Sequence, residues 1–152
     1  MLLMVDAVAR AGVGGKPNLK LAEQYWGTLT QWAEFLKAHG LDPENQLTTD
    51  DFAGHVTHNA NLALKAIDAL EAYADLAKLQ GKEAVAREYS KTAHAYAVKW
   101  VEMDREGDHF KLAYDSPGTW SQKYNLVWDQ LLGYNLFPAS VRRVSLHITR
   151  RS

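Results

Sequence analysis

The chain has no cysteine, which excludes disulfide bonds and any site built on a thiolate. It also has no long uncharged apolar run. The apolar start of the chain is interrupted by Asp6 and Arg10, so we expect neither a signal peptide nor a membrane span there. The charges of the 152 residues nearly cancel, with a net charge of −1. No global field therefore favours nucleic acid or a membrane surface as a partner.

Phosphate-binding motifs are absent as well. The glycines near position 14 match neither GxGxxG nor GxxxxGK[ST], and no segment is rich in strand-forming residues. A nucleotide-binding unit with a parallel sheet is therefore not expected. The sequence predicts no cofactor.

What the sequence does have is helical periodicity, because apolar residues recur at three- and four-residue steps. The predicted helices cover residues 1–11, 19–39, 59–79, 84–103 and 121–132. Gly81 separates the third and fourth helices by a short connection, which predicts an antiparallel helical hairpin. At most one short two-stranded element is expected, near residues 109–114. The predicted fold class is all-α.

The end of the chain differs in character from the rest. Residues 139–152 carry four arginines and no acid, and their apolar residues alternate as in a strand. This pattern does not continue the rhythm of helices and loops. We therefore expect a helical domain over residues 1–138, followed by a basic tail over residues 139–152 that is disordered or non-native.

Two segments break the helical pattern and gather side chains that do chemistry. Residues 47–61 read LTTDDFAGHVTHNAN, and residues 118–128 read GTWSQKYNLVW. Each precedes or opens a predicted helix, with Ser121 as an expected N-cap of the second. Loops that join helices on a rigid scaffold commonly carry binding residues. The two turns are therefore predicted to face one shallow cleft.

The candidate catalytic groups are carboxylates. Asp50 and Asp51 are adjacent, and two carboxylates held close together raise the pKa of one of them, as a general acid and base near neutral pH require. An aspartate before a helix can equally be a structural cap. Asp129 could act as a partner carboxyl for either one, at the 5–10 Å separation that glycoside hydrolysis needs.

The candidate substrate-binding residues are polar or aromatic side chains of the same two segments. They are His55, His58, Asn59, Asn61, Trp120, Gln122 and Lys123. With Asp51 the two histidines could form a metal site, or they could hydrogen-bond within a polar loop. No HExxH or Cys/His spacing supports zinc, so the sequence predicts no metal.

At these residues the sequence resembles the glutaminase A family of fungal enzymes and bacterial relatives. The resemblance covers roughly residues 1–138. It is carried by TDDFAGHVTHNANLALKAIDALEAYADLAKLQGK at 49–82 and by AVKWVEMDREGDHFKLAYDSPGTWSQKYNLVWDQLLGYNLFP at 97–138. The upstream segment AEQYWGTLTQWAEFLKAHGLDPENQL also fits. The resemblance implies a fold of antiparallel helical hairpins, an incomplete segment of an (α/α)6 toroid with about two to three of the six hairpins.

The family implies a glutaminase-like amidase that converts glutamine to glutamate and ammonia. Two alternatives stay open: a toroid-type glycoside hydrolase that uses paired carboxylates, and an inactive helical fragment. The expected ligand is a small molecule, glutamine or a sugar. Because helices that face sibling hairpins in a full toroid would here expose apolar stripes, we also expect a homo-oligomer, most simply a homodimer.

Overall fold

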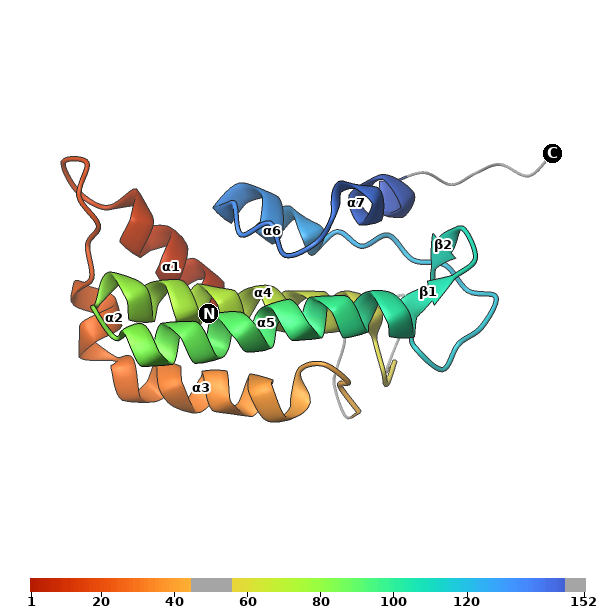
Figure 1. The fold of residues 1–152 in the computed structure, drawn as a ribbon, viewed down its shortest axis with the longest axis horizontal. Coiled ribbons are helices and arrows are strands. Elements are labelled where there is room, and N and C mark those ends of the chain that lie inside the picture. Colours follow the sequence, from red (N-terminus) through yellow and green to blue (C-terminus); the bar gives the residue numbers. More distant parts are fainter. Residues whose placement is uncertain (45–55, 147–152) are drawn as a thin grey trace.

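The computed structural model describes residues 1–44 and 56–146 of the chain, and over these residues the fold is all-α, as predicted (Figure 1). The helices are α1 (Leu2–Ala11), α2 (Lys20–Gln24), α3 (Trp26–His39), α4 (Ala60–Leu79), α5 (Glu83–Asp104), α6 (Leu126–Leu132) and α7 (Ala139–Leu146). A small antiparallel sheet joins β1 (Arg105–Glu106) to β2 (His109–Phe110).

The centre of the fold is the antiparallel hairpin of α4 and α5, which confirms the predicted pair. In Figure 1 these two helices lie side by side, with α3 on one side and α1, α6 and α7 on the other. Gly81 has φ +73° in the connection, and the N–H of Lys82 donates to the carbonyl of Ala77. A left-handed residue after a helix is the usual way to end it and turn the chain.

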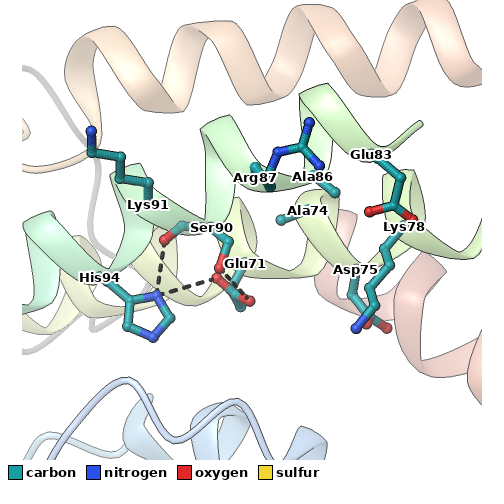
Figure 2. Close-up of a pocket in the computed structure, with 10 residues that line it drawn as sticks. All are labelled: Glu71, Ala74, Asp75, Lys78, Glu83, Ala86, Arg87, Ser90, Lys91 and His94. Carbon is teal, nitrogen blue, oxygen red and sulfur yellow. Dashed lines mark hydrogen bonds and ion pairs between the residues drawn. The ribbon is translucent and has the colours of Figure 1, made fainter. Parts of the chain in front are cut away.

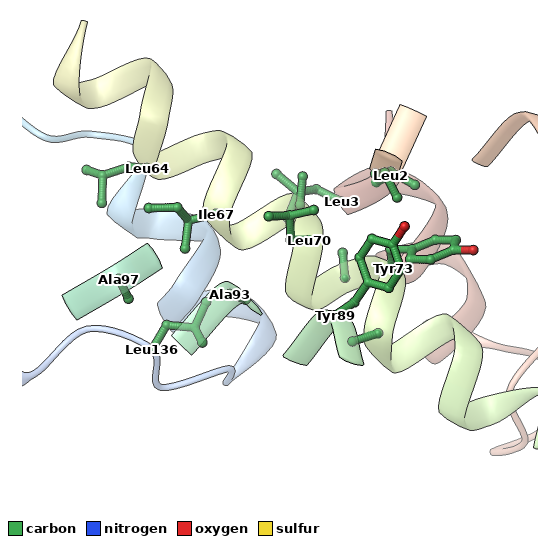
Figure 3. Close-up of a cluster of buried hydrophobic side chains, with 14 of the residues drawn as sticks. Leu2, Leu3, Leu64, Ile67, Leu70, Tyr73, Tyr89, Ala93, Ala97 and Leu136 are labelled. Carbon is green, nitrogen blue, oxygen red and sulfur yellow. The ribbon is translucent and has the colours of Figure 1, made fainter. Parts of the chain in front are cut away.

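Helix α4 packs against neighbours on most of its surface because its side chains are small or apolar. Seven of its 20 residues are alanine, and all seven are buried. Alanine costs no side-chain entropy in a helix and lets neighbouring backbones approach. Leu64, Ile67, Leu70 and Tyr73 fill the remaining space against the surrounding helices (Figure 3).

Two buried aromatic side chains stabilise the hairpin, one through a contact with its surroundings and one through a bond between its two helices. Tyr73 stacks on Trp26 with ring centroids 4.7 Å apart, and its hydroxyl lies 2.7 Å from the hydroxyl of Thr30. At the other end Trp100 is fully buried, and its indole N–H donates to the carbonyl of Ala60 at 2.8 Å. A buried Trp needs such a partner for its N–H, and this bond ties α5 to the start of α4.

Three boundaries predicted from the sequence are wrong. The helix predicted over residues 19–39 is divided into α2 and α3 at Tyr25, whose ψ of 19° departs from helical geometry. The last predicted helix begins at Leu126 with Asn125 as its N-cap position, so Ser121 is not a cap. The paired strands lie at residues 105–110 and not at 109–114.

The strand-like interpretation of the tail is also wrong for its first part. Residues 139–146 form α7, with Val141 buried in the core, because Arg142 donates to the carbonyl of Phe137 at 2.7 Å and thereby holds the helix to the preceding turn. Residues 147–152 lie outside the described residues. The division of the chain after residue 138 stays a prediction.

Large apolar side chains are exposed on α1 and α3. Trp32 and Phe35 of α3 line an apolar hollow together with Leu36, with Met1 and Leu2 at the start of the chain, and with Ala69 of α4. The self-association expected from the sequence stays a prediction. Among the helices that the structure describes, none combines the length and the apolar character required to cross a membrane.

Gly40 tests how closely α3 and α4 must approach. A Cβ atom on Gly40 would lie 2.5 Å from the carbonyl oxygen of Leu36 and 2.8 Å from the Cβ of Ala66. Gly40→Ala is therefore expected to lower the free energy of unfolding by about 1–3 kcal/mol. Gly27 in α3 has no atom within 4 Å of such a Cβ, so Gly27→Ala should be stabilising by about 0.5–1 kcal/mol. Urea unfolding of both variants checks the pair, and equal effects would contradict this packing.

Candidate active site

The two segments singled out from the sequence meet at the start of α4. The backbone N–H of Asn125 donates to Oδ1 of Asn61 at 3.1 Å, and the side-chain amide of Asn125 donates to the carbonyl of Asn61 at 2.9 Å. The N–H of Tyr114 donates to the carbonyl of His58 at 3.0 Å. The junction is therefore a network of structural hydrogen bonds between segments far apart in the chain.

Most of the polar side chains at this junction make hydrogen bonds or ion pairs with other parts of the protein. Asn59 caps α4 by accepting a hydrogen bond from the N–H of Leu62 at 2.8 Å. The Lys123 ammonium is fully buried 3.3 Å from Oδ2 of Asp104, and it donates to the carbonyl of Lys111. The structure thus gives Asn59, Asn61 and Lys123 partners within the protein, and the substrate-binding role predicted for them stays a prediction.

His58, Trp120 and Gln122 keep solvent-exposed surface near the junction. His58 has φ 56°, a backbone conformation uncommon outside glycine, and its Nδ1 lies 2.6 Å from Oδ1 of Asp42. That hydrogen bond raises the pKa of His58 above its usual range. Trp120 is 39% exposed, and no hydrogen bond between described residues joins it or Gln122 to His58. The binding roles of these three residues stay predictions.

Asp50, Asp51 and His55 lie outside the described residues, so their predicted roles also stay predictions. Within residues 1–44 and 56–146, no three His, Asp or Glu side chains cluster in a way that could hold a metal ion. The absence of a cofactor stays a prediction.

Asp129, the third predicted catalytic carboxylate, is 1% exposed and has a structural role. Its Oδ1 accepts a hydrogen bond from the N–H of Leu136 at 2.7 Å, and Arg142 lies 3.4 Å from its Oδ2. These contacts hold the turn after α6 and the start of α7. Asp129 therefore anchors this turn, and the catalytic role predicted for it stays a prediction.

The structure instead forms a cavity of about 410 Å³ along α4 and α5, which the sequence analysis missed (Figure 2). Its charged and polar lining comes from both helices: Glu71, Asp75, Lys78, Glu83, Arg87, Ser90, Lys91 and His94. In Figure 2 the side chains of Glu71, His94, Asp75 and Lys78 extend to one side of the hairpin, whereas those of Arg87 and Lys91 extend to the other.

Glu71 is a partly buried titratable group in the lining of this cavity. Its Oε1 accepts a hydrogen bond from the Ser90 hydroxyl at 3.1 Å, and its Oε2 lies 3.9 Å from Nδ1 of His94. Burial raises the pKa of Glu71 above its usual range, and the Ser90 hydrogen bond and the His94 charge oppose this shift. A carboxyl group with a raised pKa can both take up and release a proton near neutral pH.

His94 is oriented by the helix that carries it. Its Nδ1 lies 2.9 Å from the carbonyl oxygen of Ser90, one turn earlier in α5. A carbonyl only accepts, so Nδ1 donates and carries the hydrogen when the ring is neutral, which assigns the lone pair to Nε2. His94 is exposed, so this nitrogen is available to a ligand.

Two more carboxyl groups are buried nearby, Asp68 of α4 and Asp6 of α1. Burial and the nearby charge of Asp129 raise the pKa of Asp68 to about 8, and both Asp68 oxygens lack a hydrogen-bond partner among the described residues. Burial raises the pKa of Asp6 to about 7, although Asp6 accepts a hydrogen bond from the Tyr134 hydroxyl at 2.6 Å. Both groups therefore remain protonated far above the pH at which an exposed aspartate ionises.

A sequence signal for the cavity was present in the helical spacing. Glu71 and Asp75 lie four residues apart on α4, and Ser90 and His94 lie four residues apart on α5. Side chains at that spacing share a helix face, and the antiparallel hairpin brings the two faces together. The predicted helices and hairpin were therefore enough to place Glu71 opposite Ser90.

The family is decided by the comparison with known proteins. The model of the family described as "Glutaminase A six helical-hairpin domain" matches residues 1–147, nearly the whole chain. The chain belongs to this glutaminase A six-hairpin family. The family resemblance and the all-α hairpin fold expected from the sequence are thereby confirmed.

Two relatives of the family share the same level of identity with this chain. Glutaminase A of Aspergillus oryzae is 36% identical over 145 residues, which are 93% of this chain and 20% of that protein. A protein named probable glutaminase from Arthroderma benhamiae is 36% identical over 119 residues, which are 77% of this chain and 14% of that protein. The chain thus spans a fifth or less of these relatives. No solved structure matches it significantly.

The buried Lys123–Asp104 pair gives a stability test for the junction between the two segments. Lys123→Met leaves the Asp104 carboxyl in the interior without its cation, so we expect the free energy of unfolding to fall by about 3–5 kcal/mol. The double variant Lys123→Met/Asp104→Leu removes both groups and should recover most of that loss. Urea unfolding measures both, and a double variant as unstable as the single one would contradict the pairing.

The raised pKa values of Asp68 and Asp6 predict how stability depends on pH. Between an unfolded pKa of 3.8 and folded values of about 8 and 7, the native state binds more protons than the unfolded state. Stability should therefore fall as the pH rises from about 4 to 8. Asp68→Asn should flatten this slope from about pH 5 upward and remove most of the slope that remains above pH 7, where Asp6 has largely ionised. Unfolding midpoints at a series of pH values test this, and a stability that rises over the window would contradict it.

Proposed function

We propose that this chain supplies the hydrolytic site of a glutaminase-like amidase, which converts glutamine to glutamate and ammonia. Two observations support the proposal. The relatives that match the chain carry glutaminase names, and the α4–α5 cavity offers groups suited to amide hydrolysis. The observation that carries it is the Glu71 carboxyl group, which has a raised pKa and is bonded to Ser90 beside His94.

Amide hydrolysis needs one group to activate water and one to protonate the leaving nitrogen. In the proposed reaction the Glu71 carboxylate takes a proton from a water molecule while the oxygen of that water bonds to the amide carbon. Glu71 then returns the proton to the amide nitrogen as the carbon–nitrogen bond breaks, and the nitrogen leaves as ammonia. A single carboxyl can serve both steps because it gives back in the second step the proton that it took in the first, and a raised pKa makes it a stronger base for the first step.

Ser90 and His94 complete the arrangement. The Ser90 hydroxyl donates to Oε1 of Glu71 and fixes the carboxyl, whereas Oε2 is buried and has no hydrogen-bond partner among the described residues. The free Nε2 of His94 can accept a hydrogen bond from the substrate amide. No hydrogen bond joins His94 Nδ1 or Nε2 to the Ser90 hydroxyl among the described contacts, so a serine nucleophile is not proposed.

Glu71→Gln tests the reaction with little change of shape. If Glu71 is the acid and base, the variant should release ammonia from L-glutamine about 10²-fold more slowly or worse while it stays folded. Ammonia release by the wild-type chain and by the variant measures this, with circular dichroism as the control for folding. Ser90→Ala should reduce the rate less, because it removes only a positioning hydrogen bond.

Asp51→Asn distinguishes this site from the loop predicted from the sequence. A loss of turnover in Asp51→Asn, with Glu71→Gln unchanged, would move the acid and base chemistry to Asp50 and Asp51. Sugar release from aryl-glycosides, without ammonia release from glutamine, would favour the glycoside hydrolase alternative. The absence of both activities would leave a helical domain without catalysis.

A further inference from the structure

We propose that Asp75 and Lys78 bind the two charged groups of a free α-amino acid at one end of the α4–α5 cavity. Asp75 binds the ammonium group and Lys78 binds the carboxylate. The inference rests on the proposed function in one respect: Glu71 and His94 mark the end of the cavity that receives the side-chain amide. The ligand class is a zwitterion whose amide lies at a set distance from both charges.

The order of the groups along the helix supports this placement. Glu71, Asp75 and Lys78 follow one another on the same face of α4, and in Figure 2 Asp75 and Lys78 lie at the opposite end of the row from Glu71 and His94. At 1.5 Å per residue, Asp75 is about 6 Å from Glu71 along the helix axis, and Lys78 is about 10 Å away. An extended glutamine places its amide about 5–6 Å from its α-amino group by ordinary bond lengths.

The charges at this end are available to a ligand. Lys78 is exposed and makes no ion pair or side-chain hydrogen bond with any other described residue. Asp75 keeps 29% of its side chain exposed; Nε of Arg10 lies 3.8 Å from its Oδ2, and Asp75 also interacts with the buried Asp6 of α1. A pair this long and exposed leaves the carboxylate able to accept a hydrogen bond from an ammonium group.

A site that selects a zwitterion needs both an anionic and a cationic side chain. A site with only cations would hold any carboxylate, and a site with only acids would hold any amine. Asp75 and Lys78 lie three residues apart, so they are neighbours on the helix surface and can contact two groups on the same carbon atom. Hydrogen bonds between charged groups are also stronger than neutral ones.

The experiment measures equilibrium binding by calorimetry in a Glu71→Gln background, where the substrate is not consumed. The ligands are L-glutamine, 4-carbamoylbutanoate, which lacks the ammonium, and 4-aminobutanamide, which lacks the carboxylate. Asp75→Asn should weaken L-glutamine about tenfold or more and leave 4-carbamoylbutanoate unchanged. Lys78→Gln should weaken L-glutamine similarly and leave 4-aminobutanamide unchanged. Lys91→Gln is the matched control, since it removes a cation on the other side of the same cavity.

Each outcome decides between the two proposals. Effects of Asp75→Asn and Lys78→Gln that are under twofold, or equal for all three ligands, overturn the inference, as does the absence of any binding. Asp75→Asn and Lys78→Gln are also made singly in the otherwise wild-type chain. If both variants release ammonia from L-glutamine with an unchanged KM, the inference is overturned and the amidase proposal stands. The expected ligand pattern without ammonia release from the wild-type chain supports the inference and removes the amidase proposal.

Discussion

The structure depends on the burial of α4, which packs against α1, α3, α5 and α6 at once. A helix can be enclosed in this way only if its side chains leave room for four neighbours, and the seven buried alanines of α4 provide that room. The bulkier Leu64, Ile67, Leu70 and Tyr73 then fill the spaces between the surrounding helices. Because α4 is enclosed, the positions of α1, α3, α5 and α6 follow from their contacts with this helix.

The enclosure of α4 also shifts the pKa values of its acidic side chains. An enclosed helix brings its polar residues into a poorly solvated interior, where a charged carboxylate is unfavourable. On α4 this applies to Asp68 and Glu71, and burial raises the pKa of both. Asp68 has no opening to solvent, whereas Glu71 lies at the edge of the cavity shared with α5. One packing arrangement thus produces a fully buried acid with a raised pKa and a second one that lines a cavity.

The helical hairpin could be predicted closely from the sequence because its apolar period continues without interruption. The expected segments 59–79 and 84–103 became Ala60–Leu79 and Glu83–Asp104. The start of α6 could not be found in this way. Lys123 is buried against Asp104, and this tertiary contact holds residues 121–125 out of the helix, although their local pattern favours one. Likewise, the contact of Arg142 with Phe137 holds α7 where alternation suggested a strand.

The candidate site was harder to predict because the densest clusters of polar residues in the sequence lie in the loops and therefore favour a site there. Asn61 and Lys123 were chosen for their chemical types, but the fold uses their hydrogen bonds for its own stability. Glu71 and Ser90 were passed over as ordinary members of amphipathic helices. Only the register of the hairpin, which places Glu71 opposite Ser90, distinguishes them from solvated surface residues.

A crystal structure of the Glu71→Gln variant with L-glutamine would test the central claim most directly, namely that the α4–α5 cavity is the substrate site. The account predicts glutamine in that cavity, with its amide beside residue 71 and His94 and its α-amino group beside Asp75. Glutamine bound instead near His58, Trp120 and Gln122, or a cavity that stays empty at saturating glutamine, would contradict it.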